Sequence, residues 1–179
     1  MKGSRDDSTG MPGVSPNSTI EKRVWIKASA ETVYLALTNA KDLTKWFCDE
    51  AECTPCKGGE LIAVWKSGKE IQKGRGVITD LLHNALVELL WIEDGRDTLP
   101  GSPKHILRYT IKSKSGMTEV VMEDRDDASL DEETYAFLDQ GWNSVLLELK
   151  DFCERKERLV KLHSEQSNFP DQGNPLKWA

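Results

Sequence analysis

The cysteines are the first residues whose type and spacing could carry chemistry. Cys48, Cys53 and Cys56 form a C-x4-C-x2-C pattern, and Cys153 stands alone far along the chain. Structural zinc sites use thiolates paired closely in sequence, whereas Cys153 falls on the apolar face of an expected helix, where cysteine is commonly a small buried hydrophobe. A redox role for Cys53 and Cys56 lacks the β-α-β context of thioredoxin-like proteins. We therefore predict no metal ligand and no cofactor.

The histidines and an acidic cluster are weaker candidates for catalysis. His83, His105 and His163 fall in an expected turn, strand and tail, and only His105 shares a strand face with apolar residues that could enter a cavity. A general base needs an oriented partner and a reachable substrate proton, and the sequence identifies neither. The acidic residues over 123–127 and 131–133 are typical of a solvated loop before a helix, although they could attract calcium or a basic partner. We predict no catalytic residue.

Tryptophan is the residue type that most favours a binding site. Trp46, Trp65, Trp91 and Trp142 lie in elements expected to face the core or a cavity, and aromatic rings with one polar edge suit either setting. The residues predicted to line such a cavity come from the second short helix, the strands and the last helix. They are Trp46, Phe47, Trp65, Tyr109, Val120, Met122, Leu138, Trp142, Val145 and Leu149.

Length and composition predict one globular domain. The chain has 179 residues, 38% hydrophobic and 30% charged, which is enough to bury a core without a partner. Its net charge of -6 provides no positive field for nucleic acid. No apolar stretch approaches the ~20 residues of a membrane-spanning helix, and four unevenly spaced cysteines do not make a disulfide framework. We therefore predict a cytoplasmic protein with no nucleic-acid partner and no membrane insertion.

The domain boundaries follow from changes in composition. Residues 1–19 are rich in Gly, Ser, Pro, Asp and Asn and are expected to form a disordered leader. The folded domain is predicted over 20–162, followed by a loosely ordered tail over 163–179. Its first strand lies near 20–26, and Ser29 and Asn39 can each cap a short helix that follows.

A run of strands occupies the middle of the chain. β-branched and aromatic segments separated by short turns predict strands at 53–57, 60–66, 70–82, 85–92, 104–114 and 117–125. Such short links require antiparallel neighbours. Gly74 and Gly76 lack the setting of a dinucleotide site and are expected to permit a bulge or close packing against a helix.

A long amphipathic helix is predicted over about 132–161. Leu138, Trp142, Val145 and Leu149 recur at steps of three and four residues, and Asp131 or Ser129 can cap the start. The strands can bury a concave face only against this helix. The fold class is therefore α+β.

Five ordered segments resemble the activator-of-heat-shock-chaperone-ATPase family, a branch of the START-like (SRPBCC) superfamily. They are Ala28–Thr38, Leu43–Phe47, Lys57–Leu61, Gly74–Ile78 and the Gly141–Leu149 stretch containing Trp142 and Leu146. The resemblance spans about 20–160. It implies a helix-grip fold like that of birch-pollen allergen, in which a curved antiparallel sheet wraps the C-terminal helix after two short helices and leaves a cleft.

The resemblance leaves three hypotheses for function. Related domains bind lipids, sterols or other hydrophobic ligands, which implies a small hydrophobic or amphipathic ligand between sheet and helix, guarded by residues 46–47 and a 94–103 loop. The eukaryotic namesake activates a chaperone ATPase, which implies a protein-interaction module tied to stress response, although this chain has no room for the namesake's additional N-terminal domain. Some relatives are cyclases or hydrolases, and that hypothesis ranks last because no catalytic set stands out.

Overall fold

One antiparallel sheet and one long helix make up most of the molecule. The computed structural model describes residues 19–93, 105–126 and 130–167, so the predicted 94–103 loop, most of the predicted leader and the end of the tail lie outside the described residues. The described elements are β1 (Thr19–Ile26), α1 (Ala30–Thr38), α2 (Ala40–Leu43), β2 (Glu50–Cys53), β3 (Glu60–Ser67), β4 (Glu70–Leu82), β5 (Leu86–Glu93), β6 (His105–Lys114), β7 (Met117–Asp126) and α3 (Glu132–Ser167).

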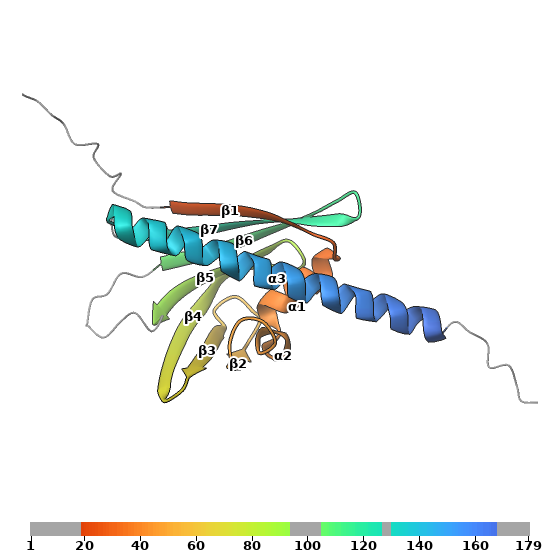
Figure 1. Cartoon of the computed structure of the whole chain (residues 1–179), viewed down its shortest axis with the longest axis horizontal. Coiled ribbons are helices and arrows are strands. Elements are labelled where there is room, and N and C mark those ends of the chain that lie inside the picture. The colour runs from red at the N-terminus through yellow and green to blue at the C-terminus, as the bar shows by residue number, and fades with distance from the viewer. Residues whose placement is uncertain (1–18, 94–104, 127–129, 168–179) are drawn as a thin grey trace, which may run out of the picture.

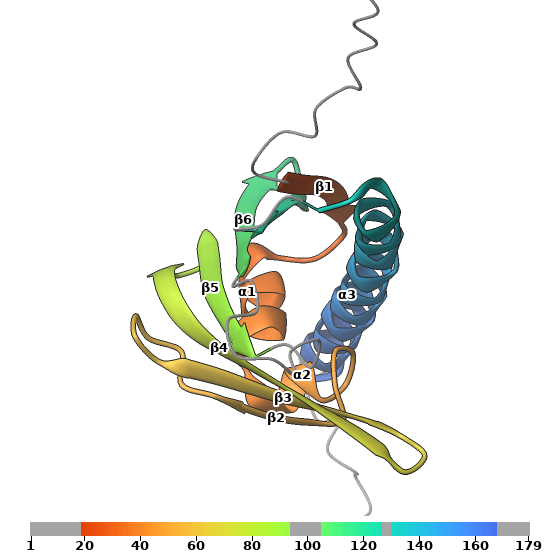
Figure 2. The same ribbon diagram turned by 90° about the vertical axis from the view of Figure 1, so that its left-hand side faces the viewer.

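The sheet has the strand order β1-β7-β6-β5-β4-β3-β2, and every neighbouring pair is antiparallel. It curves into an open arc that holds α1 inside, and α3 lies across the open side (Figure 2). The C-terminal end of α3 continues past the sheet (Figure 1). This arrangement confirms the predicted α+β helix-grip fold.

The short helices begin where the capping residues predict. The Ser29 hydroxyl accepts the Thr32 amide hydrogen bond at 3.1 Å, and the Asn39 side chain accepts those of Lys41 and Asp42. The Asp131 carboxylate accepts the Thr134 amide at 2.7 Å and caps α3 in the same way. Each cap satisfies amide groups that the helix itself leaves without a partner.

Two boundaries differ from the prediction. The strand expected at 53–57 lies at Glu50–Cys53, because the next residues form a tight turn in which the Cys56 amide donates to the Thr54 carbonyl and the Gly59 amide donates to the Cys56 carbonyl. A Cβ at Gly59 would lie only 2.0 Å from the Thr54 carbonyl oxygen, so glycine permits this turn. The last helix continues to Ser167, and its last turns include the first residues of the predicted tail.

Gly74 and Gly76 confirm the expectation of a bulge, but the close packing is against indole rings of the neighbouring strands rather than against a helix. The pairing of β4 with β5 shifts register between Arg75 and Gly76. A Cβ at Gly74 would lie 3.0 Å from the rings of both Trp65 and Trp91. Glycine at this position therefore allows two indole rings to lie against the concave face of the strand.

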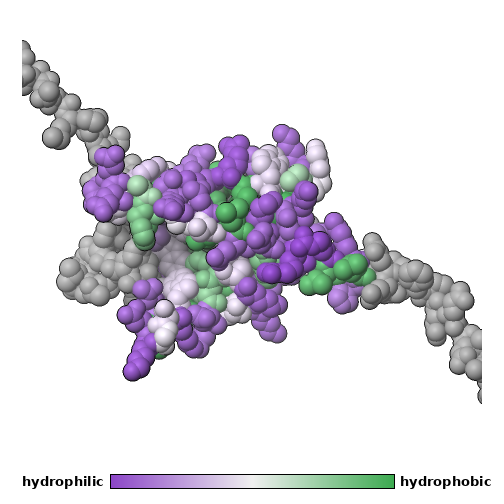
Figure 3. Space-filling model, in the orientation of Figure 1, coloured by the Kyte–Doolittle hydropathy of each residue, from purple (hydrophilic) through white to green (hydrophobic). Residues whose placement is uncertain are grey.

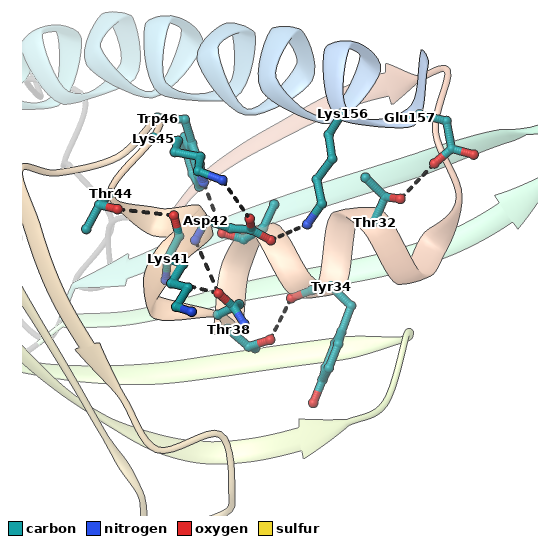
Figure 4. Close-up of polar contacts among 12 residues, drawn as sticks. Thr32, Tyr34, Thr38, Lys41, Asp42, Thr44, Lys45, Trp46, Lys156 and Glu157 are labelled. Carbon is teal, nitrogen blue, oxygen red and sulfur yellow. Dashed lines mark hydrogen bonds and ion pairs between the residues drawn. The ribbon is translucent and has the colours of Figure 1, made fainter. Parts of the chain in front are cut away.

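Polar contacts fasten the second half of α3 to α1 and α2 (Figure 4). The Glu157 carboxylate accepts hydrogen bonds from the Thr32 hydroxyl at 2.7 Å and the Ser29 amide at 3.2 Å, and Lys156 pairs with the buried Asp42. Burial alone would raise the pKa of Glu157, but the hydrogen bonds from Thr32 and Ser29 outweigh it, so the pKa is lowered. This half of the helix is therefore held by charged contacts as well as by packing.

Candidate functional site

An open cleft lies between the concave face of the sheet and the first half of α3. Its volume is about 220 Å³. The surface is hollowed below this part of the helix (Figure 3). The lining comes from the α2–β2 connection, three strands (β3, β5 and β6) and one face of α3: Phe47, Trp65, Trp91, His105, Leu107, Leu138, Trp142 and Val145.

Deeper in the arc, side chains fill the interior. The space between α1, α2 and the sheet has a volume of about 20 Å³, which is room for about one water molecule. Phe47, Trp91 and Leu107 line both this space and the open cleft. Of these two connected spaces among the described residues, the outer one against α3 has room for a ligand larger than a water molecule.

The ten residues predicted to line a cavity fall into three groups. Phe47, Trp65, Leu138, Trp142 and Val145 line the open cleft. Trp46 and Tyr109 line the small inner space. Val120, Met122 and Leu149 are fully buried core residues and line neither of these two spaces.

The predicted lining omits three residues that the structure brings to the cleft, namely Trp91, His105 and Leu107. The signal was present in the sequence as alternation, since Val87, Leu89 and Trp91 share one face of a strand and so do His105 and Leu107. Alternation alone does not tell which end of a strand stays uncovered. Pairing of Trp91 with His105 places both at the end of β5–β6 that faces the cleft.

A buried polar pair joins His105, which lines the cleft, to Asp124, which is not itself a lining residue. His105 Nδ1 lies 2.7 Å from Asp124 Oδ1, and both side chains are only 6% exposed. Trp142 Nε1 donates a hydrogen bond to the second carboxylate oxygen, Asp124 Oδ2, also at 2.7 Å. The His105 ring stacks on Trp91 with a centroid separation of 6.4 Å and an interplanar angle of 14°. Sequence reasoning missed this pair, because Asp124 was assigned to an acidic loop cluster.

The Asp124 carboxylate also influences the interior. Burial raises the pKa of the Tyr109 hydroxyl, and the negative charge of Asp124 raises it further. The polar edges of the neighbouring indoles are already occupied, because Trp46 Nε1 donates to the Ala36 carbonyl at 2.9 Å and Trp65 Nε1 donates to the Phe47 carbonyl at 2.6 Å. The cleft therefore presents mainly ring surfaces, and the Asp124 carboxylate lies behind two of its lining residues, His105 and Trp142.

The cysteines do not converge. Cys153 is buried in the core, and within residues 19–93, 105–126 and 130–167 no three His, Cys, Asp or Glu side chains are placed to hold a metal ion. Burial raises the pKa of Cys53 to about 11 and that of Cys153 to about 12, so both thiols are protonated at neutral pH. Neither is therefore poised as a thiolate nucleophile.

The second half of α3 carries exposed apolar side chains. Leu159, Val160 and Leu162 are all more than half exposed, and apolar residues gather near this end of the helix in Figure 3. A groove of about 450 Å³ beside them is lined by Lys45, Phe152, Arg155, Lys156 and Leu159. None of the helices in the described part of the chain is both long and apolar enough to cross a membrane.

Comparison with known proteins places this architecture among solved structures. The model of the family described as "Activator of Hsp90 ATPase homolog 1-like protein" matches residues 27–154. A comparison with curated proteins gave no match.

Solved structures with the same fold share little sequence with this chain. The Aha1 dimer from Colwellia psychrerythraea is 22% identical, with 76% of this chain and 96% of that one covered and a TM-score of 0.60. CalU16 from Micromonospora echinospora is 17% identical, with 83% and 84% covered and a TM-score of 0.58. DynU16, from the dynemicin biosynthetic locus, is 15% identical, with 78% and 48% covered and a TM-score of 0.65. At these identities the likeness is one of fold.

Proposed function

The chain belongs to the Activator of Hsp90 ATPase homolog 1-like family, and from that premise we propose that it binds a small hydrophobic or amphipathic molecule in the cleft between the sheet and the first half of α3. The observation that carries this proposal is the cleft itself, about 220 Å³ in volume and lined mostly by aromatic and aliphatic side chains. Ligand sites of proteins have this character, with few polar groups in a largely apolar wall.

The volume limits the ligand. It lies below the ~300 Å³ at which pockets for drug-sized ligands begin, and the deeper space offers only about 20 Å³ more. The proposed ligand is therefore a compact molecule rather than a lipid with long chains. We place its binding in the cytoplasm, as the sequence predicts.

The test is a titration of the protein with 2-naphthylmethanol, a compact neutral aromatic probe, followed through the indole N–H signals in NMR spectra. The signals of Trp65, Trp91 and Trp142 should shift together and saturate, because these rings line the cleft. The signal of Trp25, which lies on β1 and contacts Lys114, is the internal control and should stay in place. Equal shifts at Trp25, or none at the cleft rings, would overturn the proposal.

A protein partner is the second candidate, and the exposed apolar residues near the end of α3 favour it. Leu159 is 52% exposed and Leu162 is 53% exposed, beside a groove with several basic side chains. Such a surface suits a partner segment with apolar and acidic residues, such as a heat-shock chaperone could offer. The double variant Leu159→Asp/Leu162→Asp should abolish capture of an Hsp90-type chaperone in the presence of nucleotide, whereas Phe137→Asp near the other end of α3 should not. Capture that neither variant alters would exclude this surface.

A further inference from the structure

We propose that the cleft selects small aromatic cations, such as a protonated amine carried on one or two rings, over neutral and anionic molecules of the same shape. This inference rests on the proposed binding function and adds the charge of the ligand to it. The three observations that carry it are the Asp124 carboxylate beside the cleft, the occupation of two of its indole donors and the density of aromatic rings.

The charge beside the cleft comes from the Asp124 carboxylate, which is not itself a lining residue. It lies 2.7 Å from His105 Nδ1 and from Trp142 Nε1, and both of these side chains line the cleft. Among the described lining residues there is no lysine and no arginine. Lys22 of β1 forms an ion pair at 2.7 Å with Asp139, which follows the lining residue Leu138 on α3.

Two of the indole hydrogen-bond donors of the cleft are already used within the protein. Trp65 Nε1 donates to the Phe47 carbonyl and Trp142 Nε1 donates to Asp124. His105 Nδ1 lies at hydrogen-bond distance from the same carboxylate. A carboxylate or phosphate entering the cleft would lose its hydration without gaining these donors, and it would face the charge of Asp124.

The rings supply the attraction for a cation. Trp65, Trp91, Trp142 and Phe47 all line the cleft, and a cation close to an aromatic face is attracted by the ring quadrupole. Phe47 meets Trp65 edge to face, with centroids 5.3 Å apart and an interplanar angle of 78°. Gly74 allows Trp65 and Trp91 to pack against the same point of β4, so these two rings are fixed in relation to one another.

Three probes of the same ring system test the proposal. They are 2-naphthylmethylamine, which is a cation at neutral pH, 2-naphthylmethanol, which is neutral, and 2-naphthoate, which is an anion. Calorimetric titration of the full chain should give an affinity for the amine about ten-fold higher than that for the alcohol, because a desolvated cation–π contact is worth roughly 1–2 kcal/mol and ten-fold corresponds to ~1.4 kcal/mol. The naphthoate should bind more weakly than the alcohol.

The variant Asp124→Asn tests the source of the preference, because it removes the charge and keeps a similar shape. The ratio of amine to alcohol affinity should fall to about one-third of the wild-type ratio or less, as expected when a nearby charge in a partly buried site is lost. Both affinities are measured on the same variant, so their ratio serves as an internal standard. If Asp124→Asn does not fold, the comparison of the three probes on the wild-type chain still tests the cation preference.

The possible outcomes separate this proposal from the proposed function. Binding of the alcohol with equal or weaker binding of the amine overturns the cation preference and leaves ligand binding in place. Tighter binding of naphthoate than of the alcohol overturns it as well. Failure of all three probes to bind counts against the proposed function itself.

Discussion

Trp142 Nε1 donates a hydrogen bond to Asp124 Oδ2 at 2.7 Å, and this bond joins the first half of α3 to β7. The ion pair between Lys22 of β1 and Asp139 of α3 is a second polar link between the sheet and this half of the helix. The second half has more such links, through Lys150, Glu154, Lys156 and Glu157. The helix segment that forms the cleft wall thus depends strongly on one buried carboxylate.

Trp142→Phe should lower the free energy of unfolding by about 1–3 kcal/mol, because it leaves a buried carboxylate oxygen without its donor. Urea denaturation followed by circular dichroism measures the change. Trp25→Phe is the matched control, since Trp25 is 36% exposed and meets Lys114 only through a ring contact, and it should cost less than about 1 kcal/mol. Equal losses in the two variants would show that the Asp124 bond does not stabilise α3.

Glu157→Gln should lower the free energy of unfolding near pH 7 by about 1–2 kcal/mol, because charge-assisted hydrogen bonds to Thr32 and Ser29 are weakened. The pKa of Glu157 lies below its ordinary value of 4.5 in the folded protein. The stabilisation from its charge is therefore complete above that value and is lost as the pH falls through the lowered folded-state pKa.

The wild-type and Glu157→Gln stabilities should accordingly converge as the pH is lowered below about 4.5, which urea denaturation at several pH values measures. Glu148→Gln provides the control, since Glu148 is exposed on the same helix. A difference between wild type and Glu157→Gln that stays constant down to acid pH would contradict this account.

Gly74→Ala should lower the free energy of unfolding by about 1–3 kcal/mol, because its new methyl group would press on two fixed indole rings. The Cβ position lies 3.0 Å from both Trp65 and Trp91. Gly141→Ala should instead raise the free energy of unfolding by about 0.5–1 kcal/mol, because Gly141 lies inside α3 with nothing within 4 Å of the position that a Cβ would take. A stabilising Gly74→Ala would mean that the rings are free to shift.

The thiols should react in an order set by burial. Cys56 is exposed, whereas burial raises the pKa of Cys53 to about 11 and that of Cys153 to about 12. Ellman's reagent at pH 8 should therefore modify Cys56 first, and Cys153 only when urea unfolds the chain. Cys56→Ser should remove the fast phase. Rapid modification of Cys153 in the native protein would contradict its burial.

Local sequence signals predicted most of the fold. The caps at Ser29 and Asn39 satisfy helix amides by contacts within a few residues, so spacing alone locates them. The β2 strand was misplaced, because the turn before Gly59 depends on a backbone approach that strand propensity does not register.

The cleft was predictable only in part. Leu138, Trp142 and Val145 were identified because they share one face of a helix. Val120 and Met122 alternate on a strand in the same manner as Leu107, and all three are buried, yet of the three it is Leu107 that lines the cleft. The difference depends on where α3 crosses the sheet, which is a long-range relationship. The pairing of His105 with Asp124 across β6 and β7 likewise requires the strand register.

The most direct test of ligand binding in the cleft compares two neighbouring residues of α3. Leu138 lines the cleft, whereas Phe137 is 75% exposed on another face of the same turn. Calorimetric titration with 2-naphthylmethanol should show that Leu138→Trp, which fills the cleft, weakens binding at least about ten-fold, equivalent to ~1.4 kcal/mol. Phe137→Trp should bind as the wild type does. Equal affinity in the wild type and both variants would place the ligand elsewhere and contradict the account.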